Sequence, residues 1–218
     1  RSLFITKKRY AINIFDKEGK RKDKDGKLGD IKAMGLDLKR ADTPKYIQEF
    51  LLTILTMVLS GKGREEIIEI IKSFKTDLSN QPSWTKGSPK SVNNLTMYGN
   101  KEEESKTGKS NMPGHVRAAL NWNRLRKMHQ DNYSMTITDG MRIVVCKLKQ
   151  NPLGYTSVAY PVDELRIPQW FKDLPFDDLL MEHTLVDDKI DNLLGVLNWD
   201  IKSNINTNST FNSLFSFD

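Results

Sequence analysis

Alternation of apolar and polar positions predicts β-strands at the start of the chain. Residues 9–15 place Tyr10, Ile12 and Ile14 two positions apart, and a period of two is typical of a strand with one buried face. A turn is expected over residues 16–19, followed by a charged hairpin tip or loop over residues 20–29. A second strand is expected over residues 31–38, interrupted by Gly35.

The pattern then changes to helical spacing. Thr43-Pro44 is typical of a helix start, because threonine can cap the first N–H groups and proline at the first position loses no hydrogen bond. Apolar residues recur with a helical period until Gly61, at Ile47, Phe50, Leu51, Ile54, Leu55, Val58 and Leu59. A second amphipathic helix is expected over residues 64–78, and the two helices should form an antiparallel hairpin.

The remainder of the chain mixes short strands with short helices. Residues 80–111 are rich in Ser, Asn, Pro, Gly and Lys and are expected to be a loop. Strands are expected over residues 141–148 and 156–161, with a turn at residues 151–154, and helices over residues 115–128, 168–171 and 177–198. A polar tail follows Trp199. Small sheets with segregated helices indicate the α+β class.

The charge distribution indicates a polyanionic partner. The net charge of +6 divides unevenly: residues 1–130 hold 27 Lys and Arg against 15 Asp and Glu, a net +12, and residues 131–218 hold 7 against 13, a net −6. Nucleic acid fits this basic part best, since no basic stretch has the broad apolar face that membrane binding needs. With Cys146 as the single cysteine, neither a disulfide framework nor a thiolate metal site is expected. No apolar run is long enough to cross a bilayer. Residues 1–10 are basic and carry no apolar stretch, so no secretory signal is expected. The sequence opens at Arg1 without methionine and runs directly into a strand-like segment, so we expect a cut or processed start.

No catalytic or metal-binding motif is complete in this sequence. Thr107-Gly-Lys-Ser110 resembles the end of a phosphate-binding loop, but position 103 is Glu where that loop needs glycine. The three histidines, His115, His129 and His183, lack metal-ligand spacing. Adjacent acids such as Asp177-Asp178 and Asp187-Asp188 point in different directions on a helix. We therefore expect no self-contained active site and no metal in this chain.

Three basic clusters remain. In a strand, Lys7 and Arg9 would face one side and Lys8 and Tyr10 the other. A second cluster runs from Lys32 to Pro44, where Gly35 indicates the close approach of another protein or nucleic-acid backbone. In the third, a helix would place Arg117, Asn121 and Arg124 on one stripe, next to a helix amino terminus suited to phosphate.

The order of these clusters resembles one protein family. KKRY, then KxMGxDxxRxxTP before a long helix, then SVNNLxxY and PxHVRAALNWN, resemble the carboxyl-terminal part of family B DNA polymerases, with the closest likeness to replicative enzymes of T-even-like bacteriophages. The resemblance covers nearly the whole chain. It implies palm strands over residues 1–42, a mostly helical thumb with a small β element over residues 43–203, and a flexible tail over residues 204–218.

The resemblance also implies a role for each cluster. Lys7 would contact primer phosphate, Lys8 would reach the minor groove of the newest base pairs, and the thumb would wrap the product duplex. The expected DNA-binding residues are Lys7, Lys8, Arg9, Tyr10, Lys32, Gly35, Arg40, Asn93, Asn94, His115, Arg117, Asn121 and Arg124. Their partner is primer–template double-stranded DNA, held without regard to sequence.

The family's chemistry is expected elsewhere. Its magnesium-binding aspartates, its dNTP-binding fingers and its exonuclease all lie upstream of KKRY, so no cofactor is expected in this chain and no polymerase activity from it alone. The chain would be an expressed fragment or the smaller subunit of a split polymerase. An exposed sheet edge near residues 5–15 would then dock an N-terminal exonuclease, palm and fingers polypeptide.

The tail resembles a clamp-binding peptide. Ser213, Leu214, Phe215 and Phe217 keep apolar anchors on an Asn/Ser/Thr-rich leash, which implies a sliding clamp as a partner and the cytoplasm of an infected bacterium as the location. Two other interpretations are a non-enzymatic DNA-binding accessory protein and a basic RNA-binding module. The second lacks an RNP-type or KH-type motif.

Overall fold

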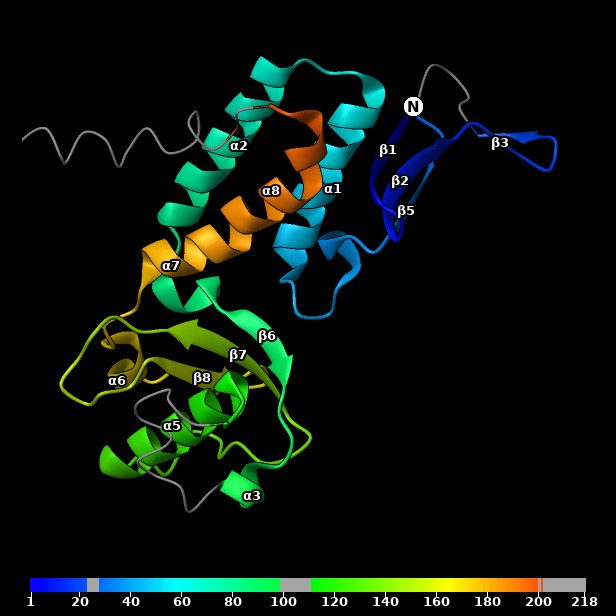
Figure 1. Ribbon diagram of the computed structural model, residues 1–218. Helices are drawn as coiled ribbons and strands as arrows, with labels where there is room; N and C mark the ends of the chain where they lie inside the picture. Colours follow the sequence, from blue (N-terminus) through cyan, green and yellow to red (C-terminus); the bar gives the residue numbers. More distant parts are fainter. Residues whose placement is uncertain (23–27, 99–110, 200, 202–218) are drawn as a thin grey trace, which may run out of the picture. The chain divides into compact units, whose positions relative to one another are not determined.

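A computed structural model describes residues 1–22, 28–98, 111–199 and 201 (Figure 1). The chain divides into two units. The first combines residues 1–79 with the chain from residue 184 onward, and the second spans residues 80–183. Both contain helices and a small antiparallel sheet, which confirms the expected α+β class.

A three-stranded antiparallel sheet opens the first unit. It has the order β1-β2-β5, formed by β1 (Ser2–Thr6), β2 (Arg9–Ile14) and β5 (Asp30–Met34). Leu3, Ala11 and Ala33 lie side by side across the strands and are buried in the core of this unit. The expected strand at residues 9–15 is confirmed. Strand β1 agrees with the strand-like segment expected directly at the start of the chain, although its bounds were not predicted.

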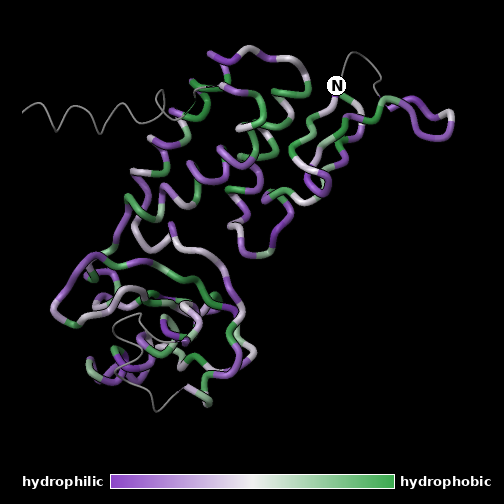
Figure 2. The backbone as a smooth tube through the Cα atoms, in the orientation of Figure 1, coloured by the Kyte–Doolittle hydropathy of each residue, from purple (hydrophilic) through white to green (hydrophobic). Residues whose placement is uncertain are grey.

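The second expected strand is shorter than predicted. Strand β5 ends before Gly35, which has a φ of +66°, and a 3₁₀ turn (Asp37–Lys39) follows. The expected turn at residues 16–19 is confirmed: β3 (Asp16–Lys17) and β4 (Lys20–Arg21) form an exposed hairpin, hydrophilic along most of its length (Figure 2).

Two long helices follow, and the first of them packs against the buried face of this sheet. Helices α1 (Lys45–Ser60) and α2 (Arg64–Ser79) agree with the predicted pair, and the rings of Phe50 and Phe74 stack between them at 3.8 Å. Gly61 ends α1 in the left-handed conformation. The expected threonine cap is wrong. Pro44 takes the capping position without a side-chain hydrogen bond, while the buried Thr43 hydroxyl oxygen accepts a hydrogen bond from Lys189 at 3.2 Å.

The helical region expected over residues 177–198 is broken into segments. Helix α7 (Asp178–Glu182) continues through a π-helical turn (His183–Asp187) into α8 (Asp188–Leu194) and a 3₁₀ turn (Gly195–Leu197). The apolar side of α8, with Ile190, Leu193 and Leu194, belongs to the same core as α1. Asp187 is buried at the π-helical turn and pairs with Lys75 of α2 at 2.8 Å.

A second three-stranded antiparallel sheet organises the other unit. Its order is β6-β7-β8, with β6 (Ser88–Ser91), β7 (Arg142–Lys147) and β8 (Ser157–Pro161). Strands β7 and β8 were predicted and are confirmed. The loop expected over residues 80–111 is wrong in part, because β6, a 3₁₀ turn (Ser83–Lys86) and helix α3 (Leu95–Tyr98) lie within it. Strand β6 was hidden because its sequence, Ser-Pro-Lys-Ser, has no apolar residue and is held by pairing with β7.

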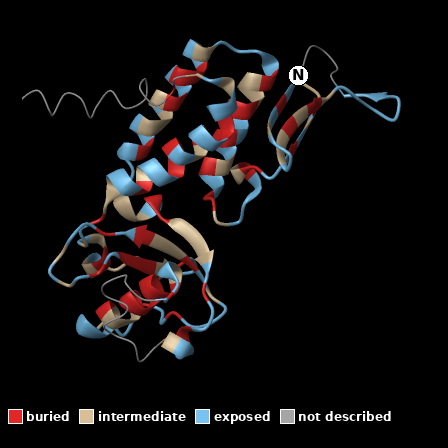
Figure 3. Ribbon diagram, viewed as in Figure 1, coloured by how far each residue is buried: buried red, intermediate tan, exposed pale blue. Residues whose placement is uncertain are grey.

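Helix α5 (Gly114–Met128) packs against this second sheet. Most of its length is coloured as buried or intermediate in Figure 3, and Trp122 contacts Phe171 of α6 (Gln169–Lys172) edge to face. Gly154 donates to the carbonyl of Asn151 at 3.0 Å, which confirms the expected turn. Among the described residues, no helix is long and apolar enough to span a membrane.

The two units follow other boundaries than the expected domains. The chain from residue 1 to residue 79 shares one core, since Ala33, Leu36 and Ile47 belong to the same cluster. Residue 42 therefore lies inside the first compact unit, and the division into palm, thumb and tail stays a prediction.

Candidate nucleic-acid interface

Lys7 and Lys8 form the two-residue turn that joins β1 to β2. Thr6 pairs with Arg9 across the hairpin, and both lysines are exposed. The expectation that these lysines alternate along a strand is therefore wrong, because β2 begins only at Arg9. Two ammonium groups on adjacent turn positions can reach consecutive phosphates, since long flexible side chains there are not confined to one sheet face.

Gly35 fixes the backbone of this turn. Its φ of +66° suits glycine, and a Cβ atom at this position would clash with the backbone carbonyl oxygen of Lys8. The close approach predicted from the sequence is thus an approach by the protein's own backbone. Gly35 itself offers no side chain to a ligand, and its effect on the interface comes through the position of Lys8.

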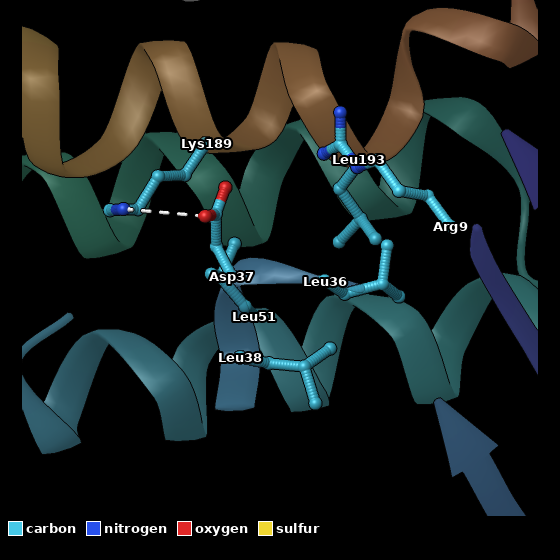
Figure 4. A pocket seen from close by; sticks show the side chains of 7 residues that line it. All are labelled: Arg9, Leu36, Asp37, Leu38, Leu51, Lys189 and Leu193. Atoms are coloured by element: carbon cyan, nitrogen blue, oxygen red, sulfur yellow. Dashed lines mark ion pairs between the residues drawn. The ribbon is translucent and has the colours of Figure 1, made fainter. Parts of the chain in front are cut away.

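Arg9 anchors the strand that carries the turn. Its Nη2 donates to the carbonyl of Asn192 in α8 at 3.3 Å. Arg9 also lines a small apolar pocket together with Leu36, Leu38, Leu51 and Leu193, and Lys189 lies 3.9 Å from Asp37 at its edge (Figure 4). Arg9 therefore holds β2 against α8 and leaves Lys7 and Lys8 as the outward cations of KKRY.

Tyr10 belongs to an apolar row on the outer face of the sheet. It pairs with Phe4 on one side and Met34 on the other, and its ring stacks on Phe4 with 5.9 Å between centroids. Phe4 is 61% exposed and Met34 47% exposed. Antiparallel sheets usually present polar residues on a solvated face, so this row is unusual. The sequence analysis missed Phe4 and Met34, since each looks like an isolated apolar residue until the register brings them together.

Two further basic residues of this unit, Lys32 and Arg40, differ in how freely their side chains can contact a ligand. Lys32 is exposed on β5. Arg40 is also exposed, but its Nε and Nη2 donate to both carboxylate oxygens of Asp42 at 3.1 and 3.0 Å, and Asp37 lies 3.6 Å away. The hydrogen bond to Asp42, its charge and the charge of Asp37 raise the pKa of Arg40. Arg40 is therefore engaged within the protein.

The remaining predicted residues lie in the second unit. Asn93 and Asn94 are exposed between β6 and α3, and Asn94 has a φ of +63°. Leu95, at the start of α3, donates its backbone N–H to Asp139 at 2.7 Å. His115 is half-buried in the first turn of α5. Burial is the main reason that its pKa lies below 6.5, and the charge of Lys90 on β6 is the second. Sequence reasoning missed Lys90, because β6 was taken for loop.

The expected basic stripe on α5 faces the protein interior. Asn121 is 0% exposed and its Nδ2 donates to the carbonyl of Ser157 at 2.8 Å, which ties α5 to β8. Arg117 is 9% exposed and its Nη2 donates to the carbonyl of Met112 at 3.2 Å. Arg124 is half-buried. The side chain of Asn121 therefore has a packing role and cannot touch a ligand in this conformation. The spacing was right, but packing of α5 against β8 covers Asn121, and Arg117 is turned back onto the carbonyl of Met112.

Metal-ligating and nucleophilic side chains are the next candidates in the described part of the chain. No group of three or more His, Cys, Asp or Glu side chains there has metal-binding geometry. Cys146 is buried in β7, and this burial raises the pKa of its thiol, as expected for a packed cysteine. The loop-like Thr107–Ser110 motif and the four tail residues lie outside the described residues.

The comparisons with known proteins all find similarity to DNA polymerases. Residues 1–183 match DNA polymerase family B. The chain is 28% identical over 156 residues to the DNA-directed DNA polymerase of Enterobacteria phage T4, covering 71% of this chain and 16% of the relative. It is 29% identical over 186 residues to the DNA-directed DNA polymerase of Escherichia phage RB69, covering 84% of this chain and 19% of the relative. The chain thus spans less than a fifth of the length of either relative.

Proposed function

We propose that this chain, which belongs to DNA polymerase family B, is the palm-and-thumb part of a phage replicative polymerase. In this role it grips the primer–template duplex. The observation that carries the proposal is the exposed Lys7–Lys8 turn, whose backbone is fixed by Gly35 and whose strand is anchored through Arg9. The named activity of both relatives, DNA-directed DNA polymerase, makes duplex DNA the natural polyanion for this turn.

The proposed grip acts mainly through phosphate. Ammonium groups of Lys7 and Lys8 neutralise backbone charge and release counterions, an interaction that carries no sequence information. Such contacts suit an enzyme whose product must slide past it. Arg9 and Gly35 act as positioning residues, and Lys32 extends the basic surface. In the second unit, the exposed Asn93 and Asn94 and the first turn of α5 provide the thumb contacts.

The chemical step is assigned to segments outside this chain. Two-metal phosphoryl transfer needs carboxylates that hold magnesium and a pocket for dNTP, and we place both on another part of the polymerase. The isolated chain is then a DNA-binding fragment or subunit without primer extension of its own.

The apolar row Phe4, Tyr10 and Met34 supports contact with that other part. Within the described sheet β1 and β5 are the edge strands and β2 is central, so the edge expected near residues 5–15 corresponds to the end of β1 and not to β2. An exposed apolar face beside an unpaired edge favours burial against a polypeptide rather than water. We propose that the exonuclease, palm and fingers portion of the polymerase covers this face, either in one chain or as a separate subunit.

A sliding clamp remains a proposed partner of the tail. Ser213, Leu214, Phe215 and Phe217 lie outside the described residues, so the proposal rests on their resemblance to clamp-binding peptides. Deletion of residues 211–218 should abolish binding to the clamp and leave duplex binding intact. Retained clamp binding would remove the tail from the proposal.

Duplex binding tests the main proposal. Fluorescence anisotropy of a labelled primer–template should show binding that weakens as salt rises. A Lys7→Ala/Lys8→Ala variant should lose affinity and reduce the slope of log K against log salt by about 1.8, because each lost phosphate contact contributes about 0.9. Lys147→Ala/Lys149→Ala, which removes the same charge from exposed positions of the second unit, is the matched control. Equal losses in both variants would reduce the effect to net charge and overturn the role of the turn.

A further inference from the structure

Strand β1 carries a β-bulge directly before the Lys7–Lys8 turn. The register between β1 and β2 shifts by one residue between two neighbouring pairs, Phe4–Tyr10 and Thr6–Arg9. Ile5 lies between these pairs and is the extra residue on β1. A bulge bends its strand and increases the local right-handed twist. The chain therefore changes direction immediately before the two exposed lysines.

The bulged segment is held on both faces of the sheet. Ile5 is half-buried and packs against the hydrophobic core of the first unit. Its neighbour Phe4 points to the outer face, where its ring stacks on Tyr10. Because apolar contacts hold the segment from both sides, the bulge is a fixed part of the sheet.

The Lys7–Lys8 turn lacks the backbone conformation that two-residue hairpins favour. Such hairpins prefer turns with a positive φ at one or both turn positions, because the twist of these turns matches the twist of the strands. Asn and Gly are typical there. Neither Lys7 nor Lys8 has a positive φ. Turns with negative φ at both positions splay the two strands apart.

The bulge can offset this mismatch. An extra residue on one strand adds right-handed twist, so the strands of a splayed hairpin can pair again beyond it. Pairing is regular from Phe4 back to Ser2. The bulge at Ile5 therefore permits a two-residue turn made of two lysines, where a hairpin without a bulge favours Asn-Gly.

We propose that Ile5 is a positioning residue, whose bulge directs the Lys7–Lys8 turn so that both lysines face the same duplex. The inference rests on the proposed function, because only that function assigns duplex DNA to this turn. Arg9 and Gly35 hold the β2 side of the turn, through Asn192 and the Lys8 carbonyl. Ile5 holds the β1 side without a charge of its own.

Deletion of Ile5 from the 218-residue chain tests the inference. The deletion removes the bulge but leaves Arg9 and Tyr10 on their present faces, because Thr6 then follows Phe4 in regular alternation. Anisotropy of a labelled primer–template should show a slope of log K against log salt that is reduced by about 0.9 to 1.8, since one or both lysines lose a phosphate.

Ile31→Ala is the control for lost packing. Ile31 is another half-buried isoleucine of the same sheet, and it pairs with Asn13 away from the turn. This variant should be less stable but should keep the parental salt slope. An equal loss of slope in Ile31→Ala would reduce the effect of the deletion to general packing and overturn the positioning role.

The deletion should act only through the two lysines. In the Lys7→Ala/Lys8→Ala background, deletion of Ile5 should cause no further change in affinity or slope, because the groups that the bulge directs are already absent. A loss of the same size in both backgrounds would overturn the positioning role.

A stability measurement tests the inference even if the deletion variant folds poorly. Lys7→Asn/Lys8→Gly introduces the turn sequence that a two-residue hairpin without a bulge favours. It should raise the thermal unfolding temperature by more in the deletion variant than in the parent chain. An equal change in both backgrounds would show that the bulge and the turn are independent and would overturn the inference.

The outcomes separate this inference from the proposed function. If Lys7→Ala/Lys8→Ala lowers the slope and deletion of Ile5 leaves it unchanged, the bulge has no positioning role and the proposed function stands. If Lys7→Ala/Lys8→Ala leaves duplex binding unchanged, the proposed role of the turn fails and the positioning role of Ile5 fails with it.

Discussion

The α-carbon of Gly35 lies so close to the backbone carbonyl of Lys8 that no side chain fits between them. This contact links the end of β5 to the turn that carries two exposed lysines. It makes the conformation of a basic turn depend on a residue 27 positions later in the sequence.

Gly35→Ala should destabilise the first unit and weaken duplex binding. The left-handed backbone disfavours alanine by about 1 kcal/mol, and the clash with Lys8 adds about 1–3 kcal/mol. Thermal unfolding and DNA anisotropy measure the two effects. Gly195→Ala in the same unit meets no atom within 4 Å and should change stability by less than about 0.5 kcal/mol. If Gly35→Ala and Gly195→Ala lowered the unfolding temperature equally, the contact between Gly35 and the Lys8 carbonyl would have no structural importance.

Asp187→Asn should destabilise the protein by about 3 kcal/mol, because it leaves the Lys75 ammonium without its buried carboxylate. Denaturant unfolding measures the free-energy change. Glu66→Gln makes the same chemical change in the exposed Lys62–Glu66 pair and should alter stability by less than about 1 kcal/mol. Comparable effects in both variants would argue against an important buried pair at the π-helical turn.

Asp131 should contribute stability that disappears in acid. Burial, the largest single influence, acts to raise the pKa of this carboxyl. Hydrogen bonds from the Ser134 hydroxyl and N–H, the Trp170 indole and the Tyr133 N–H together outweigh it and hold the pKa far below 3.8. A lowered folded-state pKa gives stability that is complete above about pH 4 and declines as pH falls below that value.

Asp131→Asn should therefore lower stability at pH 7 by about 2 kcal/mol and flatten the decline between pH 4 and pH 2. Trp170 donates to Asp131 at 2.8 Å, so tryptophan fluorescence is a suitable probe. Asp163→Asn, at an exposed position, should leave the pH profile unchanged. An unaltered acid profile in Asp131→Asn would contradict the assignment.

Phe4→Ser/Met34→Ser should leave the isolated chain folded, because both side chains are largely exposed. The same variant should lose affinity for the proposed partner, the exonuclease, palm and fingers portion, supplied as a separate polypeptide. Analytical ultracentrifugation of the mixture measures this. Tyr133→Ser, at a fully exposed position in the second unit, is the control, and equal binding by all three proteins would exclude the outer sheet face.

The sequence determined the elements whose signal is local. Residues 9–15, the helices around Phe50 and Phe74 and the strand around Cys146 each carry a period or a β-rich run that is independent of distant contacts. The order of the motifs, beginning with KKRY, also sufficed to indicate the family.

Only the tertiary structure decided which side chains meet and which face water. Strand β6 exists because β7 pairs with it, and Lys7 and Lys8 form a turn because β1 and β2 pair on either side of them. Asn121 and Arg117 carry a functional-looking spacing, but packing of α5 against its sheet buries both. Spacing along a helix defines a common face, whereas the direction of that face depends on the elements that pack against it.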